Sequence, residues 1–304
     1  MNHTIAKLVD NFISWGTVAL FFIFPLFFLP ITAEFFDFNK TLFLIGGTSL
    51  LFLAWIIKHI LHHTVRITLT PLTLPLGLIT AINLLSALLQ SPNKSEALLG
   101  RPASLSALFL LLIIVTTNST SRHHITRLLY ALIASATVLS ILAIYQFLGL
   151  NASFTSIDWL TNQAFTPAGS SLALVTFLLP LLLVSLYQAF TAKHDAVERL
   201  TLFISSGLIT LALILTTSFL LPGKPTSPFL LPYPAGWAIA IDGFKSVRSG
   251  LLGSGPDNFL AAFSQHRPAN LNLTPNWNLR FTASSNEPLH LIATTGLLGL
   301  LAWI

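Results

Sequence analysis

The chain has 304 residues, of which 54% are hydrophobic and only 8% are charged, whereas a soluble globular domain is about one quarter charged. It has no cysteine, which excludes disulfides, thiolate nucleophiles and cysteine-based metal sites. The formal net charge of +5 does not indicate a nucleic-acid partner, because the basic residues are spread between apolar runs and form no single patch.

Eight apolar segments are long enough to cross a hydrocarbon core of roughly 30 Å as helices. They predict an all-α fold, that of a polytopic helical membrane protein. The fourth segment is short, and the eighth reaches Ile304 with no polar anchor behind it, so we expect a truncated chain that would continue with further spans. The predicted spans are 12–31, 41–61, 71–90, 104–118, 126–149, 170–190, 200–221 and 288–304.

Basic residues indicate the orientation, because Lys and Arg accumulate in cytoplasmic loops. One alternating set of loops is rich in them, whereas the other short loops hold only Lys40, Lys94 and Arg101. The N-terminus is therefore expected in the cytoplasm. The expected organisation is seven helices over 1–221, a large external loop over 222–287, and the start of another helix over 288–304. The basic-rich set contains Lys7, Lys58, Arg66, Arg122, Arg127, Lys193 and Arg199.

Charged residues are missing from the middle of every predicted span. Ion-coupled transporters and proton pumps usually carry such residues at mid-membrane depth. Their absence disfavours a transporter and favours chemistry at a membrane surface. The predicted external loop is the only extended polar region of the chain, so function is expected there.

The first half of this loop contains an amphipathic pattern. Trp237, Ile241 and Phe244 fall at helical spacing, so this face either lies flat on the membrane or packs against the spans. Gly253 and Gly255 then resemble a phosphate-binding loop, but only weakly, because no strand precedes them and no GK[ST] follows. Nucleotide binding is therefore not expected.

Amide and aromatic side chains alternate near the end of the loop. Trp277 and Phe281 lie among asparagines, a combination that suits a sugar, although a turn-rich loop also uses Asn for its backbone bonds. Arg280 lies between them, and its planar guanidinium matches two oxygens of a diphosphate; a lipid headgroup or a surface salt bridge is the alternative. The asparagines are Asn270, Asn272, Asn276, Asn278 and Asn286.

A polar cluster precedes the last apolar segment. Asn286, Glu287 and His290 either mark the mouth of an active site or form an ordinary helix cap at the membrane interface. Arg101 directly follows a glycine between the third and fourth predicted spans. It either binds a diphosphate or anchors its helix among lipid headgroups.

Several of these stretches together resemble the O-antigen ligase and polymerase family. The similarity consists of GSGPDNF (253–259), Arg280-Phe281 shortly before an Asn-x-x-Leu pattern, and ATTGLLGLL (293–301). Farther upstream, EALLGRPASL (96–105) is similar to the family's text around its third and fourth spans. The order of many spans followed by one large external loop is also typical of this family.

The resemblance implies a metal-independent glycosyltransferase without a cofactor. Such enzymes transfer a glycan from a polyprenyl-diphosphate lipid to a glycan, lipid or protein acceptor at the external face of the bacterial inner membrane. It implies that Arg280 and Arg101 hold the diphosphate, with Arg267 a further candidate. Asn286 and His290 would position or activate the acceptor. Trp277 and Phe281 would support the sugar.

The chain departs from the family pattern in two places, one of which is the loop over 150–169, where it has no arginine although the family often has one. Where the family has a histidine followed at once by asparagine, this sequence has Ser285, which is expected to contact the substrate while His290 acts in place of that histidine. A serine is not a base near neutral pH without help. The alternatives are a non-catalytic glycolipid transporter or flippase, and a catalytically inactive family member that binds glycolipid. The expected partners are the donor lipid, the acceptor and membrane lipids, without nucleic acid.

Overall fold

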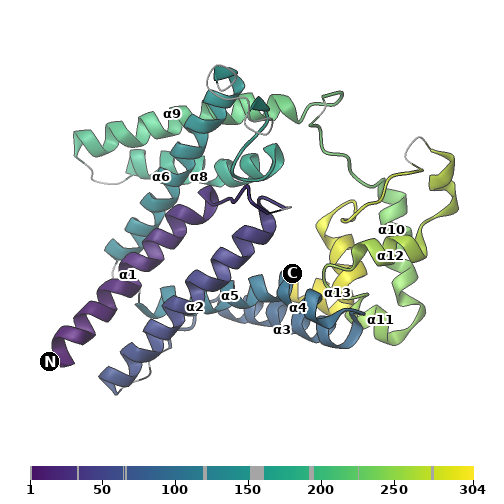
Figure 1. Ribbon diagram of the computed structural model, residues 1–304, viewed down its shortest axis with the longest axis horizontal. Coiled ribbons are helices and arrows are strands. Elements are labelled where there is room, and N and C mark those ends of the chain that lie inside the picture. Colours follow the sequence, from purple (N-terminus) through teal and green to yellow (C-terminus); the bar gives the residue numbers. More distant parts are fainter. Residues whose placement is uncertain are drawn as a thin grey trace. The chain divides into compact units, whose positions relative to one another are not determined.

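The computed structural model consists of helices and their connections over the residues that it describes (Figure 1). These are residues 2–32, 34–63, 65, 67–118, 122–150, 161–191, 195–224, 226–274 and 277–304. Seven helices within these ranges are long and apolar enough to cross a membrane, which confirms the predicted class of polytopic helical membrane protein. Arg66, Lys193 and Asn276, which the sequence singled out, lie outside the described residues.

The seven candidate spans coincide with the first seven predicted segments. The fourth is longer than expected, because a short helix, α4 (Lys94–Leu99), precedes α5 (Arg101–Asn118) with only Gly100 between them. The other six are α1 (Asn2–Leu26), α2 (Asp37–His62), α3 (Thr73–Gln90), α6 (Arg122–Phe147), α8 (Ser171–Thr191) and α9 (Ala196–Phe219).

The first helix begins at Asn2, ten residues before the predicted start of its span. Asp10 therefore lies inside the candidate span, near its N-terminal end, although it precedes the predicted one. Its carboxylate pairs with Lys58 of α2, with 2.7 Å between Oδ1 and Nζ, and Lys58 also donates to Asn118 Oδ1 at 2.6 Å. Pairing lowers the cost of placing both charges near one end of the helices.

The chain forms two compact units. The first contains residues 1–64 and 118–228, and therefore α1, α2, α6, α8 and α9. Leu139, Leu178 and Ile209 are fully buried where α6, α8 and α9 meet. At Gly47 of α2, an added Cβ would lie 2.8 Å from Leu20 of α1, so this glycine permits the close approach of the two helices.

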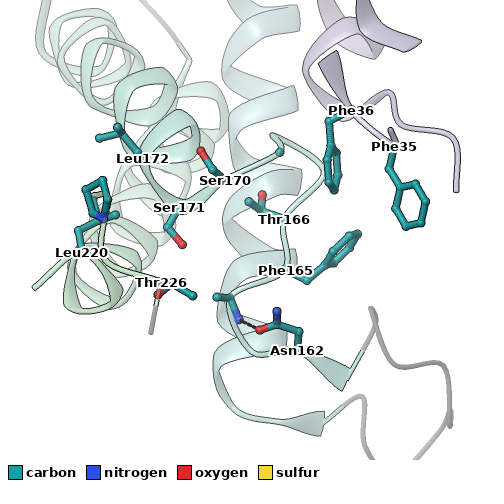
Figure 2. Close-up of a pocket in the computed structure, with 13 residues that line it drawn as sticks. Phe35, Phe36, Asn162, Phe165, Thr166, Ser170, Ser171, Leu172, Leu220 and Thr226 are labelled. Carbon is teal, nitrogen blue, oxygen red and sulfur yellow. Dashed lines mark hydrogen bonds between the residues drawn. The ribbon is translucent and has the colours of Figure 1, made fainter. Parts of the chain in front are cut away.

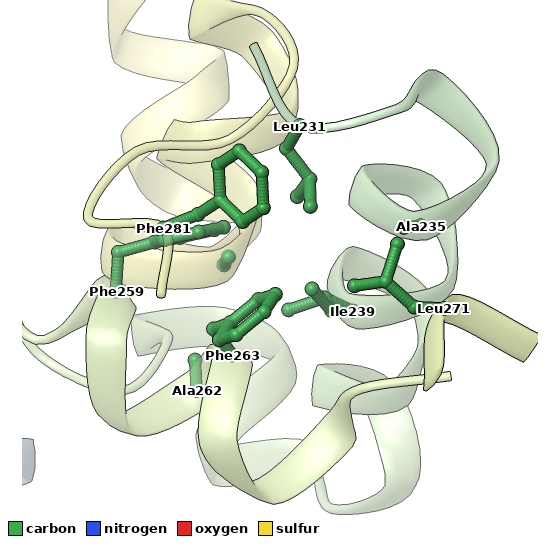
Figure 3. Packing of buried hydrophobic residues seen from close by; sticks show 9 residues of the cluster. Leu231, Ala235, Ile239, Phe259, Ala262, Phe263, Leu271 and Phe281 are labelled. Carbon is green, nitrogen blue, oxygen red and sulfur yellow. The ribbon is translucent and has the colours of Figure 1, made fainter. Parts of the chain in front are cut away.

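The second unit contains residues 65–117 and 229–304. Most of the predicted external loop thus belongs to the same unit as α3, α4 and α5, and about half of it is helical. Its core includes a cluster of apolar side chains, Leu231, Ala235, Ile239, Phe259, Ala262, Phe263, Leu271, Phe281 and Ala293 (Figure 3). The additional helices are α10 (Tyr233–Asp242), η2 (Gly243–Lys245), α11 (Val247–Leu252), α12 (Phe259–His266), η3 (Ala269–Leu273) and α13 (Glu287–Trp303).

Two glycines with positive φ meet inside this unit, and we call their contact the glycine crossing. Gly296 interrupts α13 with φ 71° and ψ −167°, and Gly253 ends α11 with φ 68° and ψ −157°. A Cβ on Gly253 would lie 2.3 Å from the carbonyl carbon of Thr294, and a Cβ on Gly296 equally close to that of Leu251. The two backbones therefore touch directly.

The break in α13 leaves carbonyl groups that other segments satisfy. The backbone N–H groups of Ser254 and Gly255 donate to the carbonyls of Ala293 and Thr294 at 3.0 and 2.9 Å. Ser86 of α3 places its hydroxyl 2.6 Å from the carbonyl oxygen of Leu252. Non-helical backbone within a membrane protein is tolerated where the protein itself supplies such partners.

Candidate functional site

The predicted polar cluster meets the start of α5, and we call this place the mouth: Arg101, Asp257, Glu287 and His290. The backbone N–H of Arg101 donates to Asp257 Oδ2 at 2.7 Å, and its guanidinium Nη2 lies 2.5 Å from Glu287 Oε1. Two carboxylates thus hold one arginine at the beginning of α5. The carboxylate of Asp257 is also favoured there by the partial positive charge of a helix N-terminus.

Backbone geometry fixes the position of Asp257. Its φ of 63° lies in the left-handed region, which aspartate adopts more readily than most residues. A Cβ on Gly100 would lie only 2.1 Å from Asp257 Oδ2, so only glycine allows the carboxylate to approach the first N–H of α5. The sequence analysis assigned no role to Asp257, although it lies within the GSGPDNF stretch.

His290 lies one turn into α13, which is not among the seven candidate spans. Its ring packs against Phe259 with 5.3 Å between centroids, and its Nδ1 is buried with no hydrogen-bond partner in the part of the chain that the structure describes. Burial lowers the pKa of His290, and the charge of Arg101 acts in the same direction against the opposing effects of Glu287 and Asp257. The imidazole is therefore neutral near pH 7, the form that accepts a proton.

Asn286 and Ser285 have structural bonds beside the mouth. Asn286 is the N-cap of α13, and its side-chain oxygen accepts the N–H of Leu289 at 3.0 Å. The Ser285 hydroxyl donates to the carbonyl of Pro232 at 3.1 Å and so ties the segment before α13 to the start of α10. The bond of Asn286 is that of the ordinary helix cap that the sequence analysis kept as an alternative.

Replacing Asn286 tests whether its side chain stabilises the protein as the N-cap of α13. Asn286→Ala is expected to destabilise the protein by about 1 kcal/mol, because an N–H of the first turn of α13 loses its acceptor. Asn286→Ser should restore most of this stability, since serine is also a good N-cap. The midpoint of thermal unfolding in detergent would report both changes. Equal midpoints for all three proteins would show that the cap contributes nothing.

A groove of about 450 Å³ lies between residues 229–231 and 279–284. Apolar side chains form most of its wall, and Arg280 is the one charged residue among those described there. Arg280 has no hydrogen-bond or ion-pair partner among the described residues, and the buried hydroxyl of Ser284 in the same wall has none either. The lining residues are Phe229, Leu230, Leu231, Leu279, Arg280, Phe281, Thr282, Ala283 and Ser284.

The last residue of the groove and the first residue of α13 in the mouth are close in the sequence. Ser284 is three residues before Glu287, and three residues of extended chain span at most about 11 Å. Arg280 and Arg101 themselves lie in these two different places, and the hydrogen bonds and ion pairs of the described residues do not join them. The structure thus brings together Arg101, Glu287 and His290, whereas Arg280 belongs to the adjoining groove.

The remaining predicted residues support the fold of the loop. Phe281 is 7% exposed, and its ring packs against that of Phe263 with 5.6 Å between centroids (Figure 3). It also packs against Phe229, with 5.9 Å between centroids. Arg267 lies over the Phe263 ring at 5.6 Å and donates to the carbonyl of Trp277 at 2.5 Å. The Trp277 side chain is 62% exposed and is thus the more accessible of the two predicted sugar-supporting rings.

A second pocket, of about 550 Å³, lies in the first unit (Figure 2). Phe36, Phe165 and Leu172 contribute apolar wall, and Thr166 and Ser170 contribute hydroxyls. None of the described residues that line it is charged, and none belongs to the predicted site. Among the described residues of the whole chain, no three His, Asp or Glu side chains are grouped to hold a metal ion.

Comparisons with known proteins leave the family of the chain open. No protein-family model matches the sequence. Searches of curated proteins and of solved structures also return no match. The resemblance to the O-antigen ligase and polymerase family therefore stays an expectation that depends on the residues quoted for it.

Proposed function

We propose that the protein is a membrane glycosyltransferase of the O-antigen ligase type, which takes a glycan from a polyprenyl-diphosphate carrier. The observation that supports this proposal best is the groove, where a guanidinium without an ion-pair partner among the described residues lies on an otherwise largely apolar wall. A polyprenyl diphosphate combines an anionic headgroup with a hydrocarbon chain, which match the cation and the apolar wall of the groove. The planar fork of Arg280 matches two phosphate oxygens, while Phe229 and Leu230 suit the first isoprene units.

The proposed reaction needs a base for the acceptor and positive charge for the leaving group. The acceptor hydroxyl oxygen attacks the anomeric carbon, the bond from that carbon to the diphosphate oxygen breaks, and the hydroxyl proton passes to His290. The lowered pKa of His290 leaves its imidazole unprotonated near pH 7, so that a ring nitrogen is available for this proton. Arg280 stabilises the diphosphate that leaves, which is the larger contribution because the leaving group is an anion.

The proposed location is the inner membrane of a bacterium, with the N-terminus in the cytoplasm. The distribution of Lys and Arg between the loops supports this orientation. The mouth and the groove then face the external side, where the glycan of a translocated carrier lipid is accessible.

A second candidate is a family member that binds glycolipid without transferring the glycan. Two contacts favour it. Ser285, at the position of the family histidine, donates to the carbonyl of Pro232, and the Arg101 guanidinium is occupied by Glu287. In this case the groove would hold the lipid, and the mouth would be a structural ion pair.

The test is release of free polyprenyl diphosphate by the protein in liposomes. The liposomes contain a polyprenyl-diphosphate-linked glycan and a mixed pool of glycan, lipid and protein acceptors. Release that requires both the protein and an acceptor is expected for a transferase. Binding of the glycolipid without release would overturn the enzyme proposal for these substrates and support the binding protein.

Glu287→Gln tests whether Arg101 contributes to donor binding. The exchange removes the charge that competes for the guanidinium, so the affinity for the donor lipid should rise by up to about fivefold. Arg101→Gln should change it in the opposite direction. Titration of each protein with fluorescent donor lipid would measure both affinities. The same affinity in the two variants would show that Arg101 serves only the ion pair.

A further inference from the structure

The segment from α10 to α11 has one buried face and one exposed apolar face. Ala235, Gly236, Ile239 and Ala240 of α10 are buried against the second unit's core. The opposite face exposes large side chains, with Trp237 49%, Ile241 48% and Phe244 47% accessible. We call this exposed set the outer stripe: Tyr233, Trp237, Ile241, Phe244, Val247 and Leu251.

Hydrogen bonds to α3 locate this segment relative to a membrane span. The Arg248 guanidinium donates to the carbonyl of Leu89, and Gln90 Nε2 donates to the carbonyl of Arg248 at 2.9 Å. Leu89 and Gln90 are the last two residues of α3, a candidate span. Arg248 therefore lies at the level where this span reaches the membrane surface.

The chain then continues from this level toward the interior of the span. Four residues after Arg248, the carbonyl of Leu252 accepts the hydroxyl of Ser86, one turn before the end of α3. Four residues of helix correspond to about 6 Å. At Gly253 the chain turns, and a Cβ on Gly255 would meet the hydroxyl of Ser91, just beyond the end of α3. The segment thus descends beside α3 and returns to its end.

An exposed apolar face at this depth meets lipid. The outer stripe leads along α10 and η2 into α11, so its side chains lie at the interface or just below it. Tyrosine and tryptophan are enriched at membrane interfaces, and the rings of Tyr233 and Trp237 stack with centroids 6.5 Å apart. The side chain of Lys245, next to this face, is 71% exposed, and a cation at such a position is favoured by anionic phosphate headgroups.

The polar side of the same segment carries its own ion pairs. Asp242 Oδ2 lies 3.0 Å from Lys245 Nζ and 3.3 Å from His266 Nδ1, and the hydrogen bond from Lys245 is the main reason that the pKa of Asp242 is lowered. The boundary between charged and apolar side chains therefore runs along η2. Such a division is that of a helix lying in a membrane interface.

We propose that the outer stripe is a membrane-embedded surface, which makes residues 233–255 a re-entrant amphipathic segment in contact with lipid. The test distinguishes lipid on the stripe from water and from a covering protein, whether a partner or a second copy of the chain. The inference does not depend on the proposed transferase activity.

The absence of cysteine allows background-free spin labelling. Single variants Trp237→Cys, Ile241→Cys and Phe244→Cys are labelled in liposomes of phosphatidylethanolamine and phosphatidylglycerol. Power saturation then compares the accessibility of each label to oxygen, which concentrates in lipid, and to a water-soluble nickel chelate. Leu85→Cys on an exposed position of α3 is the lipid-facing control, and Gln265→Cys on an exposed position of α12 is the polar control.

The expected result is an oxygen-to-nickel ratio at the three stripe positions that is several-fold above that at Gln265 and close to that at Leu85. High nickel accessibility would place the stripe in water, and low accessibility to both reagents would show that protein covers it; either result overturns the proposal. If a labelled variant does not fold, quenching of tryptophan fluorescence by brominated lipids gives a second measurement. Wild type must lose more fluorescence than Trp237→Phe, and equal losses would also overturn the proposal.

Discussion

Gly253→Ala and Gly296→Ala should each prevent the protein from reaching its folded state in the membrane. Both residues have φ near +70° and ψ near −160°, a region that is essentially restricted to glycine. The new methyl group would lie 2.3 Å from backbone atoms of the partner segment, which cannot move as a flexible side chain can. Strain and the displaced backbone together cost several kcal/mol, comparable with the whole stability of a protein domain.

The measurement is the fraction of fluorescently tagged protein that elutes as a single species after extraction in detergent. Gly207→Ala and Gly46→Ala are matched controls, because an added Cβ on either would contact nothing within 4 Å. These helical exchanges should be neutral or stabilise the protein by up to about 1 kcal/mol. If Gly253→Ala elutes like Gly207→Ala, then the two backbones do not meet as described.

The sequence predicted the membrane class and the first seven spans because apolar length alone determines them. It failed at the start of α1, where Asp10 and Lys7 interrupt the apolar run. The partner that permits the charge of Asp10, Lys58 of α2, is distant in sequence. Where a helix begins near charged residues thus depends on which residues of other helices pair with those charges. The apolar run of one segment carries no information about such pairing.

The sequence did not predict the glycine crossing either. In the sequence, Gly253 and Gly255 weakly resemble a phosphate loop. In the structure, this stretch contacts and hydrogen-bonds the backbone of α13 just after the end of α11. A glycine pattern specifies unusual backbone, but it does not say whether a ligand or another segment occupies the space. Gly296 likewise permits the close approach of the two segments by interrupting its own helix.

The site was predictable only where local spacing decides it. Asn286 followed by Glu287 and Pro288 is a recognisable helix start, and the structure has that cap. The ion pair of Arg101 with Glu287 joins residues 186 positions apart, so the sequence alone could place them near each other only through a family resemblance. Phe281 looked suited to a sugar, but neighbouring rings that the sequence does not locate bury it in the core.

Arg280→Ala should reduce transfer, measured as kcat/KM for release of polyprenyl diphosphate, by about 10- to 100-fold. This is the range expected for losing charge-assisted hydrogen bonds of about 1.5–3 kcal/mol between a guanidinium and a diphosphate. Folding should not change, because Arg280 has no hydrogen-bond or ion-pair partner among the described residues to lose. The unfolding midpoint of the variant should therefore equal that of wild type, which separates a binding role from a structural one.

Two further variants identify which property of Arg280 matters. Arg280→Lys keeps the charge but loses the planar fork, so it should recover only part of the activity if two phosphate oxygens are bound together. Lys224→Ala removes an exposed positive charge outside the groove and should leave release unchanged. Equal losses in Arg280→Ala and Lys224→Ala would mean that the protein attracts the anionic donor through its overall charge. A loss confined to Arg280, with partial recovery by lysine, requires the donor diphosphate to lie in the groove, because general attraction does not distinguish a guanidinium from an ammonium.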